Sequence, residues 1–93
     1  MNLSQLRYVI TVTECGSFSK AAQKLYITQP TLSQQIAALE NELGVRLFSR
    51  GKQVALTDAG AALMRHARAI LEEQDRLLLT MSEYARLKRG TLK

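Results

Sequence analysis

The sequence has few of the residue types from which covalent and metal sites are built. Its only cysteine is Cys15 and its only histidine is His66, so no disulfide can form within the chain. One cysteine and one histidine cannot supply the ligands of a usual zinc site. Cys15 ends an apolar stripe, which favours a small buried side chain over a nucleophile. Because the sequence also shows no nucleophile–base pair and no glycine-rich phosphate loop, we expect no catalysis and no cofactor.

Long apolar runs and aromatic residues are scarce as well. No segment approaches the roughly 18 uninterrupted apolar residues of a membrane-spanning helix. The N-terminal segment, MNLSQLRYVI, lacks the charged start and apolar core of a secretion signal. We therefore expect a cytoplasmic location and no membrane partner. With three tyrosines, two phenylalanines and no tryptophan, the chain offers no stacking platform for single-stranded DNA or RNA.

The composition that is present fits one small domain. Ninety-three residues with 46% hydrophobic side chains favour a folded domain over a disordered chain. A domain of this size buries only about 60–65% of the surface of its unfolded chain, so helix packing or oligomerisation must add stability. The formal net charge of +5 is compatible with a nucleic-acid partner, but basic charge alone is weak evidence because many proteins share it.

Apolar periodicity predicts two helices in the first part of the chain. Leucine, isoleucine and valine recur at helical spacing over residues 3–12, and Asn2 with Gln5 forms a capping pair at the start of this segment. Ser17 is a good N-cap for a second helix over residues 18–25.

A third helix is predicted after a turn at residues 26–28. Pro30 suits its first turn, where the missing N–H costs nothing, and Gly44 is expected to end it in the left-handed conformation. Two short helices joined by a tight turn are typical of a helix-turn-helix. The buried stripe of the third helix repeats at steps of 4, 3 and 4 residues: Leu32, Ile36, Leu39 and Leu43.

The segment after the third helix predicts a short β-hairpin. Two mostly apolar segments, residues 47–49 and 54–56, flank a basic tip at 50–53. Thr57 is the expected N-cap of a long helix that begins near Asp58.

A mostly apolar pattern in the long helix alternates steps of 4 and 3 over about three heptads, which predicts a coiled-coil seam. We therefore expect a mostly α fold: a winged helix-turn-helix, with a three-helix core and a β-hairpin wing, over residues 1–57, followed by a dimerisation helix over residues 58–89. The seam, and hence the predicted dimer interface, consists of Leu63, Ala67, Ile70, Gln74, Leu77, Met81 and Tyr84.

The exposed face of the third helix carries short polar and amide side chains near its N-terminus. An α-helix fits the DNA major groove, where each base pair presents a distinct set of donors, acceptors and methyl groups. For any single residue, a solvated helix start explains the side chain as well as a base contact does. For the whole set, placed directly after a tight turn, we favour base contacts: Gln29, Thr31, Ser33, Gln34 and Gln35.

The third helix has no lysine or arginine, and Glu40 and Glu42 lie at its far end. Attraction to DNA phosphates must therefore come from other segments. A solvated side chain explains the lysines of the second helix almost equally well, and the basic residues of the wing could instead enter the minor groove. The candidates for backbone or minor-groove contacts are Lys20, Lys24, Arg50 and Lys52.

Four motifs together resemble the N-terminal domain of LysR-type transcriptional regulators. They are SF-x-x-AA-x-x-L, Q-P-x-L-S-x-x-I, LE-x-x-LG-V-x-LF-x-R and LT-x-AG, within a resemblance that covers residues from about 2 to 93. It implies a bacterial regulator that binds and bends promoter DNA as a dimer, and as a tetramer in the full-length protein. A small-molecule co-inducer would bind a domain absent from this chain, and residues 90–93 look like the lead-in to that domain.

The resemblance also implies roles for individual residues. It places the wing around Arg50 against the DNA backbone or minor groove, and it makes the long helix a linker helix that pairs antiparallel with its partner's. Many members have arginine where this chain has Gln34, so a neutral contact replaces a charged one, and the wing is one residue shorter than the common form. The residues that would face bases are Gln29, Pro30, Thr31, Ser33 and Gln34.

A second hypothesis makes the long helix the functional surface of a protein-interaction module. It leaves the polar face of the third helix unexplained. A salt titration separates the two hypotheses, because DNA binding weakens steeply as counterions compete.

Overall fold

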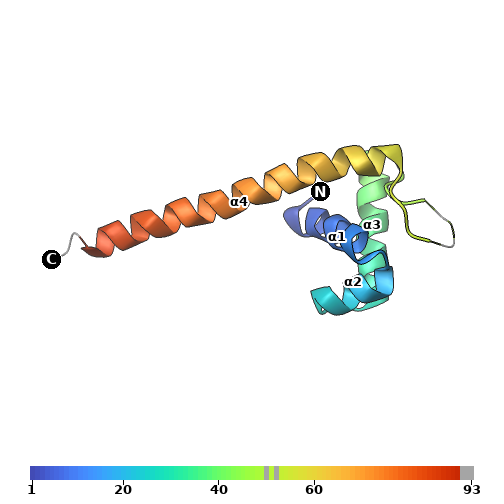
Figure 1. Cartoon of the computed structure of the whole chain (residues 1–93), viewed down its shortest axis with the longest axis horizontal. Coiled ribbons are helices and arrows are strands. Elements are labelled where there is room, and N and C mark those ends of the chain that lie inside the picture. The colour runs from blue at the N-terminus through green and yellow to red at the C-terminus, as the bar shows by residue number, and fades with distance from the viewer. Residues whose placement is uncertain (50, 52, 91–93) are drawn as a thin grey trace.

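Four helices make up most of the described chain (Figure 1). The computed structural model describes residues 1–49, 51 and 53–90, with the backbone alone at 89 and 90. The mostly α fold and the four predicted helices are confirmed. Arg50 and Lys52, which were predicted to lie at the wing tip, and residues 91–93 lie outside the described residues. The helices are α1 (Leu3–Cys15), α2 (Phe18–Leu25), α3 (Gln29–Leu43) and α4 (Asp58–Gly90).

Side chains cap the starts of α1 and α2 as the sequence predicts. Asn2 Oδ1 accepts a hydrogen bond from Gln5 N at 2.8 Å, and Gln5 Oε1 accepts one from Asn2 N at 3.1 Å, which completes the capping box. Ser17 Oγ accepts from Lys20 N at 3.2 Å. These bonds satisfy N–H groups that have no partner within the helix.

Residues in the left-handed conformation end the first three helices. Gly16 follows α1 with a φ of 67°, and Gly44 follows α3 with a φ of 74°, as expected for glycine at this position. Tyr26 ends α2 with a φ of 59°, a conformation that costs a residue with a Cβ roughly 1–2 kcal/mol. Its side chain is 95% exposed, so packing of the ring offsets little of this cost.

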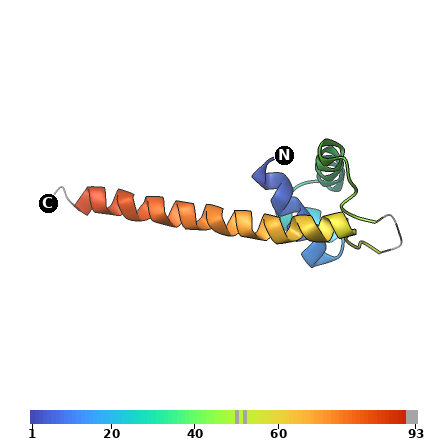
Figure 2. The same ribbon diagram turned by 90° about the horizontal axis from the view of Figure 1, so that it is seen from above.

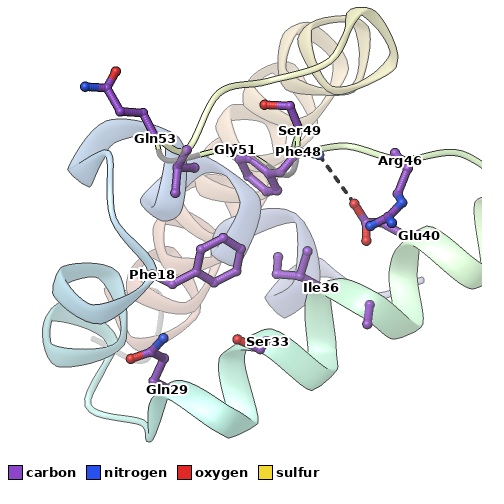
Figure 3. Close-up of a pocket in the computed structure, with 12 residues that line it drawn as sticks. Phe18, Gln29, Ser33, Ile36, Glu40, Arg46, Phe48, Ser49, Gly51 and Gln53 are labelled. Atoms are coloured by element: carbon purple, nitrogen blue, oxygen red, sulfur yellow. Dashed lines mark hydrogen bonds between the residues drawn. The ribbon is translucent and has the colours of Figure 1, made fainter.

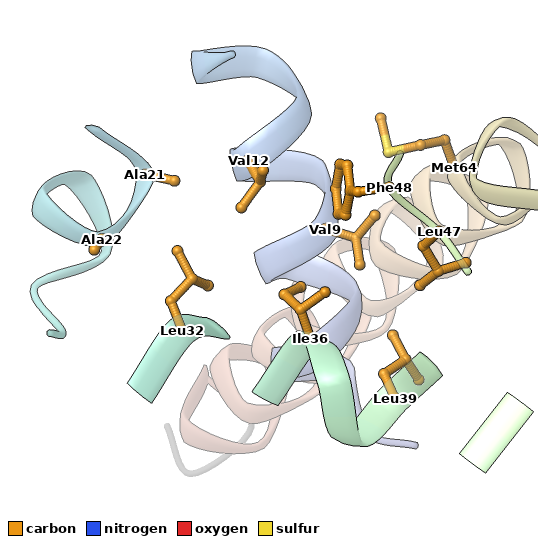
Figure 4. Packing of buried hydrophobic residues seen from close by; sticks show 10 residues of the cluster. All are labelled: Val9, Val12, Ala21, Ala22, Leu32, Ile36, Leu39, Leu47, Phe48 and Met64. Atoms are coloured by element: carbon orange, nitrogen blue, oxygen red, sulfur yellow. The ribbon is translucent and has the colours of Figure 1, made fainter. Parts of the chain in front are cut away.

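The hydrophobic core lies where α1, α2 and α3 meet (Figure 4). Ala21 and Ala22 have small side chains that let α2 lie close to its neighbours. The rings of Phe18 and Phe48 meet edge to face, with centroids 5.6 Å apart and planes at 70°, and this contact joins α2 to the segment after α3. The buried cluster consists of Val9, Val12, Ala21, Ala22, Leu32, Ile36, Leu39, Leu47, Phe48 and Met64.

The segment between α3 and α4 carries the predicted wing. Its described residues pair at one antiparallel bridge, between Phe48 and Leu56. Hydrogen bonds flank the bridge on both sides, from Ser49 N to Ala55 O at 2.8 Å and from Thr57 N to Leu47 O at 3.0 Å. The predicted strands are therefore reduced to a single bridge, and the two ends of the hairpin are nevertheless held together.

Gly60 lets α4 start directly against this segment. Thr57 Oγ1 accepts from Gly60 N at 3.0 Å, and the Thr57 hydroxyl donates to the carbonyl oxygen of Arg46, so Thr57 caps α4 as predicted. A Cβ at Gly60 would overlap the carbonyl oxygen of Leu47. This close approach explains the glycine of the LT-x-AG motif.

The C-terminal part of α4 projects away from the other helices (Figures 1 and 2). Its 33 residues span about 50 Å at 1.5 Å per residue, and the molecule measures 61 × 25 × 20 Å. α1 packs beside the N-terminal part of α4. There Arg68 Nη1 lies 3.6 Å from Glu14 Oε2, and Arg7 Nη2 donates to Gln74 Oε1 at 3.2 Å. In contrast, residues 75–88 are all exposed.

Within the described ranges, no helix combines the length and the apolar character that crossing a bilayer requires.

Candidate nucleic-acid interface

α2 and α3 form the two arms of a helix-turn-helix, joined at residues 26–28. α3 buries Leu32, Ile36 and Leu39 in the core that it shares with α1 and α2, and this leaves its opposite face in solvent. The five residues predicted to face bases are all exposed: Gln29, Pro30, Thr31, Ser33 and Gln34.

Gln35 does not share that exposed face. It is half-buried, and Gln5 Nε2 donates to its Oε1 at 3.3 Å and to its backbone carbonyl at 3.5 Å. Gln5 itself is buried, so the pair links α1 to α3 inside the domain. The prediction that Gln35 points to DNA is wrong, because its amide is turned toward α1.

Hydrogen bonds order the first turn of α3. Thr28 Oγ1 accepts from Thr31 N at 3.2 Å and donates to Thr31 Oγ1 at 2.8 Å. Ser19 on α2 donates its hydroxyl to Gln29 Oε1 at 3.1 Å. Two of the predicted base-contacting side chains therefore have intramolecular partners: Thr31 bonds to Thr28 of the turn, and Gln29 bonds to Ser19 of α2.

A groove of about 300 Å³ separates α3 from the segment that follows it. Figure 3 shows Gln29 and Ser33 along its α3 side and Phe18, Ile36 and Phe48 along its apolar floor. Beside that floor, the polar lining comes from both sides: Gln29, Ser33 and Glu40 from α3, with Arg46, Ser49 and Gln53 from the following segment.

Glu40 is a positioning residue that the sequence pattern did not reveal. Its Oε2 accepts from Leu47 N at 2.8 Å and from Phe48 N at 3.3 Å, a bond that Figure 3 shows. One carboxylate therefore anchors the start of the wing to the end of α3. A carboxylate near the C-terminus of a helix interacts unfavourably with the helix dipole. This position was the only signal in the sequence that Glu40 contacts a segment outside its own helix.

The basic residues of α2 are available to a polyanion. Lys20 and Lys24 are exposed, and neither forms an ion pair with any residue that the structure describes. Arg46 is also exposed and lines the groove, while its backbone carbonyl accepts the Thr57 hydroxyl. In contrast, the described residues contain no cluster of histidine, cysteine or carboxylate side chains that could hold a metal ion.

Comparison with known proteins identifies the family. The sequence pattern described as "Bacterial regulatory helix-turn-helix protein, lysR family" matches residues 3–61, which cover α1, α2, α3, the wing segment and the start of α4. The chain belongs to the lysR family.

Relatives and solved structures of the lysR family resemble most of this chain. It is 41% identical over 91 residues to the nitrogen assimilation regulatory protein nac of Klebsiella aerogenes, covering 97% of this chain and 30% of that protein. It is 53% identical over 72 residues to an uncharacterized HTH-type transcriptional regulator of Azotobacter vinelandii, covering 76% of this chain and 50% of that protein. The chain thus spans half or less of the length of these two relatives.

A solved structure with DNA has the same fold. The BenM DBD in its complex with catB site 1 DNA superposes with a TM-score of 0.88 at 42% identity, covering 91% of this chain and 97% of that chain. At this identity the likeness extends beyond the fold to the sequence.

The structure places the predicted seam of this lysR-family chain in two different environments. Leu63 packs partly buried against the core, and Ala67 is only 1% exposed within a single chain. Ala67 therefore has almost no surface left to bury against a partner. Gln74 is half-buried and accepts the hydrogen bond from Arg7. The other predicted interface residues are exposed: Ile70, Leu77, Met81 and Tyr84.

The length of α4 explains why the seam divides. Its N-terminal end, at Leu63 and Ala67, packs on the core of the same chain. Its C-terminal end, at Leu77 and Tyr84, lies on the part of α4 that projects beyond the other helices (Figure 1), where residues 75–88 are exposed on every face.

Proposed function

We propose that this chain binds double-stranded DNA sequence-specifically, with α3 in the major groove and two copies joined through α4. The observation that carries the proposal is the exposed N-terminal face of α3. Five side chains there serve no packing role, on a helix whose opposite face is fully used by the core. In the major groove, a helix of this kind brings amide and hydroxyl groups to the base edges, where the base pairs differ in their donors and acceptors. The residues proposed to contact bases are Gln29, Pro30, Thr31, Ser33 and Gln34.

Attraction to phosphate comes from the flanks of α3 in this proposal. Lys20 and Lys24 lie on α2, which crosses the DNA backbone in helix-turn-helix proteins. Arg46 joins them from the groove beside α3. The proposed wing contacts of Arg50 and Lys52 rest on the sequence, since both lie outside the described residues. Phosphate contacts set position and affinity, and base contacts set sequence.

A second copy of the chain is the proposed partner of α4. The exposed part of this helix carries Leu77, Leu78, Met81 and Tyr84, which are 49–65% exposed. A helix with such a stripe at heptad spacing is stable when a second helix covers it. Two domains joined in this way would read an inverted repeat whose half-site spacing follows from the dimer.

The relatives are longer than this chain. We propose that the whole protein is a cytoplasmic transcription regulator and not an enzyme. The name of the relative from Klebsiella aerogenes is that of a regulator. We propose a tetramer for the full-length protein and control by a small-molecule co-inducer that binds outside the present chain.

Selection of bound duplexes from a random DNA pool tests the proposed function. We expect enrichment of one inverted repeat, and affinity for it should fall steeply as salt rises because counterions compete for phosphates. If the bound pool remains random in sequence, the proposal is wrong. If the chain instead binds a protein partner and this binding is insensitive to salt, the result supports the protein-interaction hypothesis.

Two substitutions then separate base contacts from phosphate contacts. Ser33→Ala should weaken binding by about 1–3 kcal/mol and relax specificity at one or two base pairs. Lys24→Ala should weaken binding to all DNA sequences alike. It should also reduce the slope of log affinity against log salt concentration by about one. If the two variants lose affinity in the same pattern, the assignment of roles is incorrect.

A further inference from the structure

We infer that the first turn of α3 reads DNA as a set of hydrogen-bond donors, so that it selects guanine or thymine edges over adenine and cytosine. The inference rests on the proposed function and specifies the bases that it would recognise. It follows from the intramolecular hydrogen bonds of Gln29 and Thr31, both of which are exposed residues of this turn.

The amide of Gln29 is oriented by Ser19. The Ser19 hydroxyl donates to Gln29 Oε1 at 3.1 Å, which holds the carbonyl side of the amide toward α2. Gln29 Nε2 has no hydrogen-bond partner among the described residues, so its two N–H groups are available to a ligand. A glutamine fixed in this way presents donors to the groove.

An adenine edge does not suit this arrangement. Glutamine pairs with adenine through two bonds, in which Oε1 accepts from the N6 amino group while Nε2 donates to N7. Here one lone pair of Oε1 already accepts from Ser19, so adenine would have to bind the remaining lone pair of an oxygen that Ser19 holds toward α2. Guanine presents two acceptors, N7 and O6, and thymine presents O4, and these match the two N–H groups of Nε2 without any use of Oε1.

Thr31 has the same polarity. Thr28 donates its hydroxyl hydrogen to Thr31 Oγ1 at 2.8 Å and uses its own oxygen to accept from Thr31 N. The Thr31 oxygen is therefore engaged as an acceptor, and no described residue takes its hydroxyl hydrogen. Thr31 can donate to a base, and its methyl group suits a neighbouring thymine methyl.

Residues of the next turn lack this constraint. Ser33 and Gln34 are exposed and make no side-chain hydrogen bond to any described residue. The Gln34 amide can therefore turn either way. The chain thus carries two exposed glutamines on one helix, of which one is fixed as a donor and the other is free.

Substitution at Gln29 tests the donor polarity directly. Gln29→Glu replaces the donating nitrogen with an accepting oxygen of nearly equal size. Binding is measured on duplexes from the random-pool selection in which each base pair is varied in turn. The preference for guanine or thymine at one position should fall roughly tenfold or more. The preferred base there should become cytosine, whose N4 amino group donates to carboxylates. The added negative charge weakens all duplexes alike, so it cancels in the ratio between bases.

Substitution at Ser19 tests how the polarity is set. Ser19→Ala should raise the affinity for duplexes with adenine at the position that Gln29 reads, relative to those with guanine or thymine. In a protein that already carries Gln29→Ala, adding Ser19→Ala should leave the base preference at that position unchanged. Gln23→Ala is the matched control, because Gln23 is exposed one turn later on the same helix, and it should leave the base preference unchanged.

The outcomes separate the inference from the proposed function. If selection yields no preferred sequence, the proposed function and this inference both fall. If a sequence is selected but wild type prefers adenine or cytosine at the Gln29 position, or Ser19→Ala behaves as Gln23→Ala does, the donor inference alone is overturned.

Discussion

The carboxylate of Glu40 should contribute far more to stability than its exposed neighbour on the same helix. Glu40 Oε2 is the acceptor for the backbone N–H groups of Leu47 and Phe48, at 2.8 and 3.3 Å. Hydrogen bonds to a charged group contribute roughly 1.5–3 kcal/mol each when buried. Because this site is only part-buried and the second bond is long, we expect Glu40→Ala to lower the free energy of unfolding by about 2–4 kcal/mol, equivalent to roughly 8–32 °C in Tm for a domain of this size.

Glu42 supplies the matched control. It lies two positions further along α3 and pairs with the N-terminal amino group of Met1 at the surface, so Glu42→Ala should cost about 0–1 kcal/mol. Both variants remove one negative charge near the C-terminus of α3, so the gain of about 0.3–1 kcal/mol from the helix dipole is similar in each. Urea unfolding at one fixed protein concentration measures both. If Glu40→Ala and Glu42→Ala agree within about 0.5 kcal/mol, the anchoring role of Glu40 is refuted.

Three further substitutions follow from the backbone and the exposed part of α4. Gly60→Ala should destabilise the fold by at least about 1–3 kcal/mol in thermal unfolding, since its Cβ would overlap the Leu47 carbonyl oxygen; an unchanged Tm would contradict the close packing of α4 on the wing. Tyr26→Gly should stabilise the isolated chain by up to about 1–2 kcal/mol by relieving the φ of 59°, and a lower Tm would mean that the exposed ring contributes to the fold. Leu77→Asp should weaken self-association in sedimentation equilibrium while leaving the helicity of the domain intact, whereas Arg76→Asp, next to it on the exposed helix, should have a smaller effect. Equal dimer affinities for the two variants would show that the stripe at Leu77 is not the interface.

The helices could be predicted because their signals are local. The capping box of Asn2 and Gln5, the N-cap at Ser17 and the left-handed Gly44 each involve residues close together in sequence, and the structure contains all of them. Each of these bonds forms within one helical turn, so the sequence alone specifies them.

The features that the sequence did not reveal depend on contacts between distant segments. Gln35 looks like an exposed residue of α3 until α1 brings Gln5 to it, 30 residues away in sequence. Glu40 finds its partners seven and eight residues later, across the end of a helix. No local pattern encodes such bonds, because they exist only once the elements have packed.

The seam of α4 is an intermediate case. Heptad spacing placed Ala67 and Leu77 on one stripe, and the stripe exists. Which end of it remains exposed is decided by where α1 packs, through the contacts at Glu14 and Arg7. Periodicity gives the face of a helix, and only the tertiary packing shows which neighbour covers it.

The ratio between the affinities for the selected duplex and for a scrambled duplex of equal length tests the central claim most directly. Both affinities should be measured with the 93-residue chain at one stated salt concentration near physiological. We predict that the selected duplex binds roughly 10³-fold more tightly or better, because base contacts from α3 add to phosphate contacts that both duplexes share. Equal affinities for the two duplexes would contradict the claim that α3 reads sequence.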